Sequence, residues 1–338
     1  MEKFLIIKFS ALGDIIHTIP AFSALRKRFP EAEIIWVVKK NGKEILDLVP
    51  GIDRLVIDHT REFGKNLRKI TLDFFRLYKE FKERNQIALD FQGLMKSGFL
   101  AFLSRAEKRI GFHKNNLREP LASVFYTDTL EEIPENNHVI RKNLKLLTVI
   151  GIHEEQLEFP LLFPEHLTES VWVKLKNIGY DGRKKLILFN IGANWETKRW
   201  APEKWVLLAK LMKRGDFFPV ILWGNEEEKS LALKIHYDTH IPLSPSFSIK
   251  EVMGLMREAS LLISGDTFAL HAACALSVPV VGIYGPTLPQ RNGPFNTKAR
   301  VMVHEIECSF CRKRHCESVE CLKNISPSEV AESAFQLL

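Results

Sequence analysis

A repeated alternation between short apolar runs and longer amphipathic segments is the feature that most constrains the fold of this chain. The apolar runs of the N-terminal half are 4–9, 34–38, 55–57 and 87–91, and those of the C-terminal half are 186–190, 219–223, 261–264 and 279–284. Short buried runs that alternate with helical patterns are typical of βαβ units around a parallel sheet. The sequence therefore predicts an α/β protein with two Rossmann-like, doubly wound domains.

The length of 338 residues also favours two domains, because one hydrophobic core rarely supports so long a chain. Pro and Gly interrupt a mixed polar stretch between 151 and 185, where we place the boundary. We expect a first domain at 1–165, a second at 183–325 and a C-terminal helix at 326–338. Two such domains facing each other would leave a central cleft at the carboxyl ends of their strands, where sheets of this kind bind ligands.

The net charge of +7 favours anionic partners such as nucleic acid, phosphorylated lipid or nucleotide. A nucleic-acid-binding protein is a remote alternative, because the basic residues are spread over both domains and no recognition helix is evident. The N-terminal run lacks the features of a signal peptide, and no apolar stretch is long enough to cross a bilayer. We therefore expect a cytoplasmic protein with at most peripheral membrane contact.

A polar loop follows the first apolar run, directly before the first helical pattern. In this loop Ser10 and Gly13 lead to Asp14, at the start of an expected helix over 14–28. An Asp at this position can simply be an N-cap. A carboxylate that stays ionised there can also serve as a general base toward a hydroxyl group. The two interpretations are compatible, and the sequence leaves both open.

The second domain has a comparable loop between the run 261–264 and an alanine-rich helix. Its glycine lets the backbone approach a ligand, and the amides of 266–268 with the helix dipole predict an anion site suited to a diphosphate. The alternative is a capped core helix with a buried histidine, which leaves the histidine unexplained. The residues of this candidate site are Gly265, Asp266, Thr267, Phe268 and His271.

Two other loops of the second domain carry charge at strand ends. Lys198 and Arg199 follow the run 186–190, where they would neutralise a leaving diphosphate, although loop cations are commonly just solvated. Glu226 and Glu227 follow the run 219–223, where a carboxylate would bind ribose hydroxyls. A plain acidic helix start explains the two glutamates equally well.

Five phrases of the sequence, in order along the chain, resemble glycosyltransferase family 9, the ADP-heptose:lipopolysaccharide heptosyltransferases. The phrases are SALGDIIHTIPA at 10–21, DFQGLMKS at 90–97, REPLASVFY at 118–126, GDTFALH at 265–271 and YGPT at 284–287. The second and third phrases are most similar to the heptosyltransferase I branch. Heptosyltransferase II, or a related enzyme with another sugar, is the alternative.

The resemblance implies a GT-B fold, with the acceptor bound by the N-terminal domain and ADP-heptose by the C-terminal domain. It also implies inverting transfer of heptose to a Kdo residue of Kdo-lipid A, with no cofactor required, in lipopolysaccharide core biosynthesis. The enzyme would work in the cytoplasm, in peripheral contact with the inner face of the cytoplasmic membrane. No nucleic acid is implied as a partner.

The resemblance also implies roles for individual residues. Asp14 matches the base of the family and Lys198 its diphosphate-contacting lysine, whereas the acidic residue on the donor ribose aligns with Glu226 or Glu227. The donor motif corresponds to Gly265, Asp266, Thr267, Phe268 and His271. The expected acceptor-binding residues are Ser10, Gly13, Arg61, Lys65, Arg68, Lys96 and Arg118. Ordinary surface charge explains the group at 61–68 equally well.

A cysteine-rich segment near the C-terminus departs from the heptosyltransferase I pattern. Cys308, Cys311, Cys316 and Cys321 lie in a basic stretch. In a reducing compartment, two thiols in a Cys-x-x-Cys pair with two more suggest a structural zinc site. Disulfides and free thiols remain alternatives, because the spacing is shorter than in common zinc ribbons.

Overall fold

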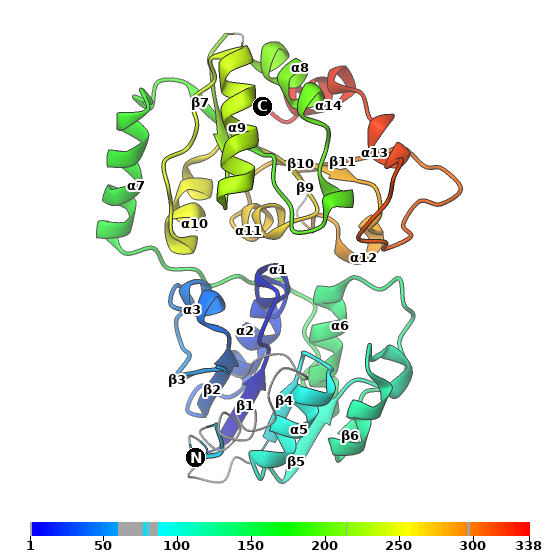
Figure 1. Ribbon diagram of the computed structural model, residues 1–338. Helices are drawn as coiled ribbons and strands as arrows, with labels where there is room; N and C mark the ends of the chain where they lie inside the picture. Colours follow the sequence, from blue (N-terminus) through cyan, green and yellow to red (C-terminus); the bar gives the residue numbers. More distant parts are fainter. Residues whose placement is uncertain (1, 60–76, 80, 82–86, 214, 296–297) are drawn as a thin grey trace. The chain divides into compact units, whose positions relative to one another are not determined.

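The chain folds into two compact units, Met1–Leu162 and Phe163–Leu338. The computed structural model describes residues 2–59, 77–79, 81, 87–213, 215–295 and 298–338. Each unit contains one sheet of parallel strands flanked by helices (Figure 1). The predicted α/β class with two Rossmann-like domains is therefore confirmed.

The sheet of the first unit has six strands in the order β3-β2-β1-β4-β5-β6, which is the order of the dinucleotide-binding Rossmann sheet. The strands are β1 (Lys3–Ile7), β2 (Glu33–Val38), β3 (Arg54–Ile57), β4 (Ile87–Asp90), β5 (Lys108–Gly111) and β6 (Asp128–Thr129). Residues 4–7 of β1 are completely buried, as expected for a central parallel strand covered on both faces. The winding direction reverses between β1 and β4, so the loops after these two strands lie side by side.

The first helical segment of this unit is divided into two helices, where one was expected. The expected single helix over 14–28 is wrong: α1 (Leu12–Ile16) and α2 (Ile19–Arg28) are separate. Pro20 lacks an amide hydrogen and its ring disfavours continuation from the preceding turn. The buried side chain of Asn143 donates to the freed carbonyl oxygen of His17 at 3.0 Å. The break therefore leaves α1 as a short helix at the strand ends.

Among the described residues, further helical elements of this unit follow β2, β4, β5 and β6. They are α3 (Lys40–Leu46), α5 (Met95–Leu103), α6 (Val139–Leu146), and the 3₁₀ turns η1 (Lys114–Asn116), η2 (Pro120–Phe125) and η3 (Leu147–Ile150).

The sheet of the second unit is wound differently, with five parallel strands in the order β11-β10-β9-β7-β8. The strands are β7 (Lys185–Asn190), β8 (Phe217–Leu222), β9 (Leu261–Gly265), β10 (Val280–Tyr284) and β11 (Ala299–Val303). This is the flavodoxin-like order, in which the winding reverses between the first and third strands of the unit. That reversal lies between β7 and β9, and sheets of this order commonly bind ligands at the carboxyl ends of these strands.

The helices of the second unit flank its sheet. They are α7 (Glu165–Asn177), α8 (Pro202–Met212), α9 (Glu226–Thr239), α10 (Ile249–Glu258), α11 (Phe268–Ala275), α12 (Pro289–Asn292), α13 (Glu320–Lys323), α14 (Pro327–Phe335) and the 3₁₀ turn η4 (Glu196–Lys198). The expected C-terminal helix is present as α14, and Ser326 and Glu329 form a capping box at its start. Across the part of the chain that is described, no helix is both long and apolar enough to span a membrane.

Candidate active site

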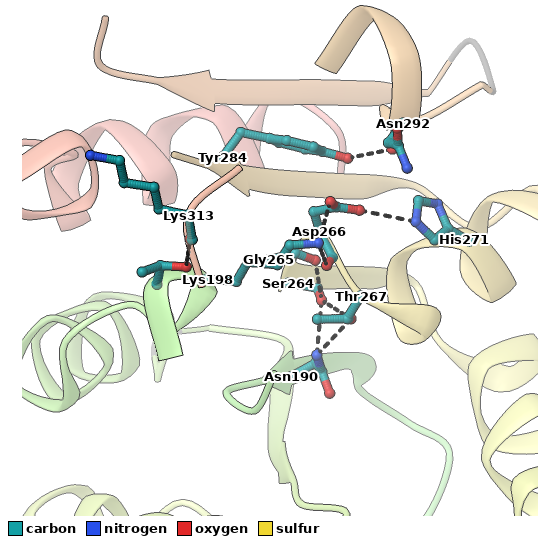
Figure 2. A network of polar contacts seen from close by, with 11 residues as sticks. Asn190, Lys198, Ser264, Gly265, Asp266, Thr267, His271, Tyr284, Asn292 and Lys313 are labelled. Carbon is teal, nitrogen blue, oxygen red and sulfur yellow. Dashed lines mark hydrogen bonds and ion pairs between the residues drawn. The ribbon is translucent and has the colours of Figure 1, made fainter. Parts of the chain in front are cut away.

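The ends of β7 and β9 are joined by a side chain that the sequence analysis did not single out. Asn190, the last residue of β7, donates to the hydroxyl oxygens of Ser264 at 2.9 Å and Thr267 at 3.0 Å. Figure 2 shows the amide of Asn190 facing both hydroxyl groups. The only sequence signal for it was a polar residue ending a buried run. This contact fixes the loop between β9 and α11 at the point where the winding reverses.

The N-terminus of α11 has no side-chain cap within the described residues. Thr267 occupies the N-cap position, but its side chain makes no hydrogen bond to the amides of the first turn. Its hydroxyl group is instead 3.0 Å from both Asn190 and Ser264. The first-turn amides of a helix need an outside partner, and the helix dipole favours a negative one. The loop therefore leaves the first-turn amides of α11 without a side-chain cap, and the anion site expected here stays a prediction.

Asp266 lies beside this helix start as a buried ion-pair centre. Its Oδ2 atom is 2.6 Å from the Nζ atom of Lys198, and its Oδ1 atom is 3.1 Å from the Nε2 atom of His271. Burial raises the pKa of this carboxyl, but the hydrogen bond and charge of His271 and the charge of Lys198 outweigh burial and hold the pKa well below its usual value. Asp266 is therefore a fixed negative charge that orients the ammonium group of Lys198 and the imidazole ring of His271.

His271 is buried, with 4% of its surface exposed. It lies in α11, one turn after the N-cap residue Thr267. Figure 2 shows the imidazole ring facing Asp266. His271 therefore contacts Asp266 in the interior of the second unit.

The loop that carries Lys198 is held by the basic segment near the C-terminus. The hydroxyl group of Thr197 donates to the carbonyl oxygen of Lys313 at 2.7 Å. The indole ring of Trp195 has two cations over it, the ammonium group of Lys198 at 4.5 Å and the guanidinium group of Arg314 at 5.1 Å from its centroid. Positive charge therefore concentrates on this loop.

The acidic start of α9 separates into exposed and inward-facing residues. The side chains of Glu226 and Glu227 are 83% and 72% exposed and pair with Lys229 and Arg199. Glu228 instead accepts a hydrogen bond from the amide of Gly224 at 2.7 Å. A Cβ atom on Gly192, after β7, would lie 2.1 Å from the Glu228 carboxyl carbon. Of these three glutamates, Glu228 is the one that faces the ends of β7 and β8, and the sequence analysis did not single it out.

The first unit has its own polar cluster where its winding reverses. Gln92, after β4, accepts hydrogen bonds from the amides of Phe9 at 3.0 Å and Ser10 at 3.2 Å, after β1. The buried ammonium group of Lys8 donates to the carbonyl oxygen of Phe91 at 2.9 Å. The two strand-end loops are therefore tied together, and this holds the loop that leads to α1.

A buried carboxyl group supports the turn that carries Gln92. Asp90 accepts hydrogen bonds from the amides of Gln92 at 2.8 Å and Gly93 at 3.0 Å and from the hydroxyl group of Tyr126 at 2.7 Å. Burial raises the pKa of Asp90 despite these hydrogen bonds. The same burial, with the charge of Asp90, raises the pKa of Tyr126. The sequence did not indicate that Asp90 and Tyr126 interact, because they are far apart in the chain.

Asp14 lies on α1, directly after the loop that Gln92 holds. The N-cap of α1 is Ala11, so the interpretation of Asp14 as the N-cap is wrong. Asp14 is the third helical residue, and its Oδ2 atom accepts a hydrogen bond from the Ala11 amide at 3.1 Å. That contact engages one carboxylate oxygen and fixes the side chain. Asp14 is partly exposed, as a base that receives a substrate proton must be.

The other expected acceptor residues have different surroundings. Ser10 lies in the loop held by Gln92, and Gly13 lies in α1, which follows that loop. Arg118 is exposed and precedes η2. Lys96 forms an ion pair with the buried Asp58, and its ammonium group lies 4.5 Å from the centroid of the Phe9 ring. Its charge is thus engaged within the unit, close to the same loop. Arg61, Lys65 and Arg68 lie outside the described residues.

The four C-terminal cysteines are free thiols, three of them exposed and Cys321 buried. Amide hydrogen bonds from Val319 and Ser318 lower the pKa of Cys316. Burial raises the pKa of Cys321, and charge on Cys308, Cys311 and Cys316 acts in the same direction. Among the described residues, no three His, Cys, Asp or Glu side chains converge as metal ligands. A preformed zinc cage is therefore not part of this structure, and zinc binding stays a prediction.

Comparison with known proteins identifies the family. The profile described as glycosyltransferase family 9 (heptosyltransferase) matches residues 74–321. A lipopolysaccharide heptosyltransferase 1 from Campylobacter coli is 30% identical over 99% of this chain and 98% of its own length. The chain therefore belongs to glycosyltransferase family 9, and it is a glycosyltransferase. The predicted family and enzyme class are confirmed.

Solved structures show the same fold. A family 9 glycosyltransferase from Veillonella parvula superposes with a TM-score of 0.85 at 22% identity, covering 99% of this chain and 97% of that one. The E. coli heptosyltransferase WaaC with ADP-2-deoxy-2-fluoro heptose superposes with a TM-score of 0.77 at 20% identity, covering 99% of this chain and all of that chain. The GT-B fold implied by the sequence is thereby confirmed.

The buried Asp266 gives a prediction for stability. Asp266→Asn leaves Lys198 and His271 without their negative partner, and we expect a loss of about 3 kcal/mol in the free energy of unfolding. Glu227→Gln, which removes the partner of an exposed ion pair, is the control and should cost less than about 1 kcal/mol. Urea unfolding at pH 7 measures both values. Equal losses in the two variants would contradict the proposed centre.

The lowered pKa of Asp266 also fixes the pH dependence of that difference. A depressed folded-state pKa gives stability that is present above the unfolded pKa of about 3.9 and is lost as the pH falls through the folded value. The difference in the free energy of unfolding between the native protein and Asp266→Asn should therefore stay constant from pH 7 to about 5. It should become smaller below about pH 4. A gap that narrows between pH 7 and 5 would contradict this assignment.

Gln92 gives a prediction for activity. Gln92→Ala removes the acceptor for two loop amides, so the loop before α1 loses its fixed position, and we expect the kcat of sugar transfer to fall about tenfold or more. Gln92→Glu keeps an acceptor oxygen and should retain most of the activity. Affinity for ADP, measured by calorimetry, should stay unchanged in both variants. A loss of ADP affinity, or equal loss of kcat in both, would contradict a positioning role.

Proposed function

We propose that this chain transfers heptose from ADP-heptose to a Kdo residue of Kdo-lipid A, in the assembly of the lipopolysaccharide inner core. The observation that carries the proposal is the edge of the second sheet, where an uncapped helix start and Lys198 converge at the ends of β7 and β9. Such an edge suits a nucleoside diphosphate group. Family membership supplies the reaction class.

The donor diphosphate would lie at the first turn of α11. Its oxygens would accept hydrogen bonds from the amides of 267–269, and the helix dipole would favour their charge. Lys198 donates to the carbonyl and carboxylate oxygens of Asp266, at 3.1 and 2.6 Å. An ammonium group has three donors, so one remains for a phosphate oxygen. Lys198 would thus stabilise the charge that grows on departing ADP.

The ribose of the donor would be bound by Glu228. Its carboxylate lies against the backbone of Gly192 and holds the amide of Gly224, at the ends of β7 and β8. Glu226 and Glu227, the residues expected for this role, point toward other side chains at the surface. A carboxylate at the end of a neighbouring strand is a common ligand for ribose hydroxyls in Rossmann-like sheets.

The chemical step would begin with the removal of a proton from the Kdo hydroxyl group by Asp14. The hydroxyl oxygen then forms a bond to the anomeric carbon of heptose as the bond from that carbon to the diphosphate oxygen breaks, with inversion. The electron pair of that bond leaves with ADP, toward Lys198 and the α11 amides. Because the chain supplies this positive charge, the proposed step requires no cofactor.

The acceptor assignment rests on the heptosyltransferase I phrases and on the relative from Campylobacter coli. Kdo and lipid A carry carboxylates and phosphates, which fit basic residues such as Arg118. Since lipid A is held by a bilayer, the enzyme would work in the cytoplasm, in peripheral contact with the inner face of the cytoplasmic membrane.

The proposal is tested by transfer from ADP-heptose to Kdo-lipid A, with released ADP and the acceptor mass as readouts. Asp14→Asn keeps the side-chain size and the acceptor for the Ala11 amide but lacks the base. We expect its kcat to fall about a hundredfold or more, with little change in the KM for ADP-heptose. Glu31→Gln, an exposed acid of the same unit, is the control and should behave as native.

Two outcomes would contradict parts of this proposal. Native kcat in Asp14→Asn would remove Asp14 as the base. Transfer only to an acceptor that already carries heptose would identify a heptosyltransferase II activity in place of the proposed one.

A further inference from the structure

An apolar surface on the first unit is not explained by the active site. Three large side chains on α5 and η2 are strongly exposed: Phe102 by 53%, Leu121 by 69% and Val124 by 70%. Isolated exposed apolar residues are ordinary, but clustered ones mark interaction surfaces. We call these three residues, with the half-buried rings of Phe99 and Phe125, the α5–η2 patch.

The two elements that carry the patch pack closely against each other. The ring of Phe125 lies 5.7 Å from that of Phe99 and 6.2 Å from that of Phe102, measured between centroids. Gly98 brings α5 close to η2, since a Cβ atom there would lie 3.0 Å from the carbonyl oxygen of Ala122. The exposed side chains therefore stand on two elements that pack tightly against each other.

Basic residues accompany the patch. Residues 95–118 contain six Lys and Arg, at 96, 105, 108, 109, 114 and 118, and one acidic residue, Glu107. Arg109 lies at the edge of the patch, with its guanidinium carbon 5.8 Å from the centroid of the Phe102 ring. It is held there by hydrogen bonds to the carbonyl oxygens of Phe125 at 2.7 Å and Ala106 at 3.0 Å.

Most of the other cations of this segment face solvent. Arg105, Lys108, Lys114 and Arg118 are exposed, whereas Lys96 forms an ion pair with Asp58. The charge of the segment is therefore displayed on the outside of the unit, on the elements that carry the patch or adjoin them.

We propose that the α5–η2 patch docks the first unit onto a bilayer that contains anionic phospholipid. Apolar side chains would enter the boundary between headgroups and acyl chains, and the neighbouring cations would lie at the level of the lipid phosphates. Two weak signals of this kind together give reversible attachment. The inference rests on the proposed function, in which a lipid-borne acceptor meets the first unit.

The charge pattern selects this occupant over a second copy of the chain. In a symmetric self-association the same basic segment would face itself, and like charges oppose such a contact. An anionic lipid surface instead complements every exposed cation of the segment.

The test is co-sedimentation of the full chain with vesicles of phosphatidylcholine containing 30% phosphatidylglycerol, and with phosphatidylcholine alone. We expect binding to the anionic vesicles that weakens with added salt. The double variant Leu121→Ser/Val124→Ser should bind them at least about tenfold more weakly, because two apolar side chains no longer enter the membrane. The matched control is Val173→Ser/Leu207→Ser, which changes two side chains of the second unit that are 59% and 52% exposed, and it should bind as the native protein does.

A second readout separates this inference from the proposed function. With a water-soluble, deacylated Kdo acceptor, the Leu121/Val124 variant should transfer heptose at the native kcat, because the patch lies outside the chemical step. Failure of the native protein to use this acceptor, with vesicle binding as expected, would contradict the proposed function alone.

Three results would overturn membrane docking by the patch. One is native vesicle binding by the Leu121/Val124 variant with an unchanged melting temperature, and another is an equal loss in the control. The third is a native dimer, seen by light scattering, that this variant converts to monomer, since the patch would then belong to a second copy.

Discussion

The buried charge of Asp266 is the interaction on which the second unit's site depends. A carboxylate that is almost completely buried requires charged or hydrogen-bonding partners, and the fold provides Lys198 from one strand-end loop and His271 from α11. These contacts set the position of the Lys198 ammonium group and of the backbone before the helix. With Thr267 engaged by Asn190, the helix amides are left for a ligand. The buried ion pair therefore positions groups that can bind a negatively charged ligand.

The first unit positions its loop through hydrogen bonds that Gln92 and Asp90 accept from backbone amides. Gln92 bridges the ends of the two strands at which the winding reverses, and Asp90 holds the turn that presents Gln92. The loop so fixed leads directly into the short helix that carries Asp14. In both units the candidate residues are therefore placed by hydrogen bonds across the reversal of the sheet, where parallel strands leave a crevice.

Much of the fold could be predicted because apolar periodicity reports burial directly. The runs that became β1, β7 and β9 are apolar on both faces, and the cap of α14 is written in consecutive residues. Pro20 is a local signal for the break after α1, but the position of the break also depends on Asn143, which binds the carbonyl oxygen of His17 and lies far along the chain. The resemblance singled out the loop before α11 as the candidate donor site. It could not separate Glu228 from its acidic neighbours, because only the helix geometry decides which carboxylate faces Gly192.

The most direct test of the account is amide hydrogen exchange of the native protein with and without ADP. The first-turn amides of α11 have no capping side chain in the described structure, so they should exchange rapidly in the free protein and become protected when ADP binds. Protection should appear in peptides that cover 266–270 and 192–198, the two loops joined by Lys198 and Asp266. Binding of ADP with protection elsewhere and none at the start of α11 would contradict the assignment of the donor site to this edge of the second sheet.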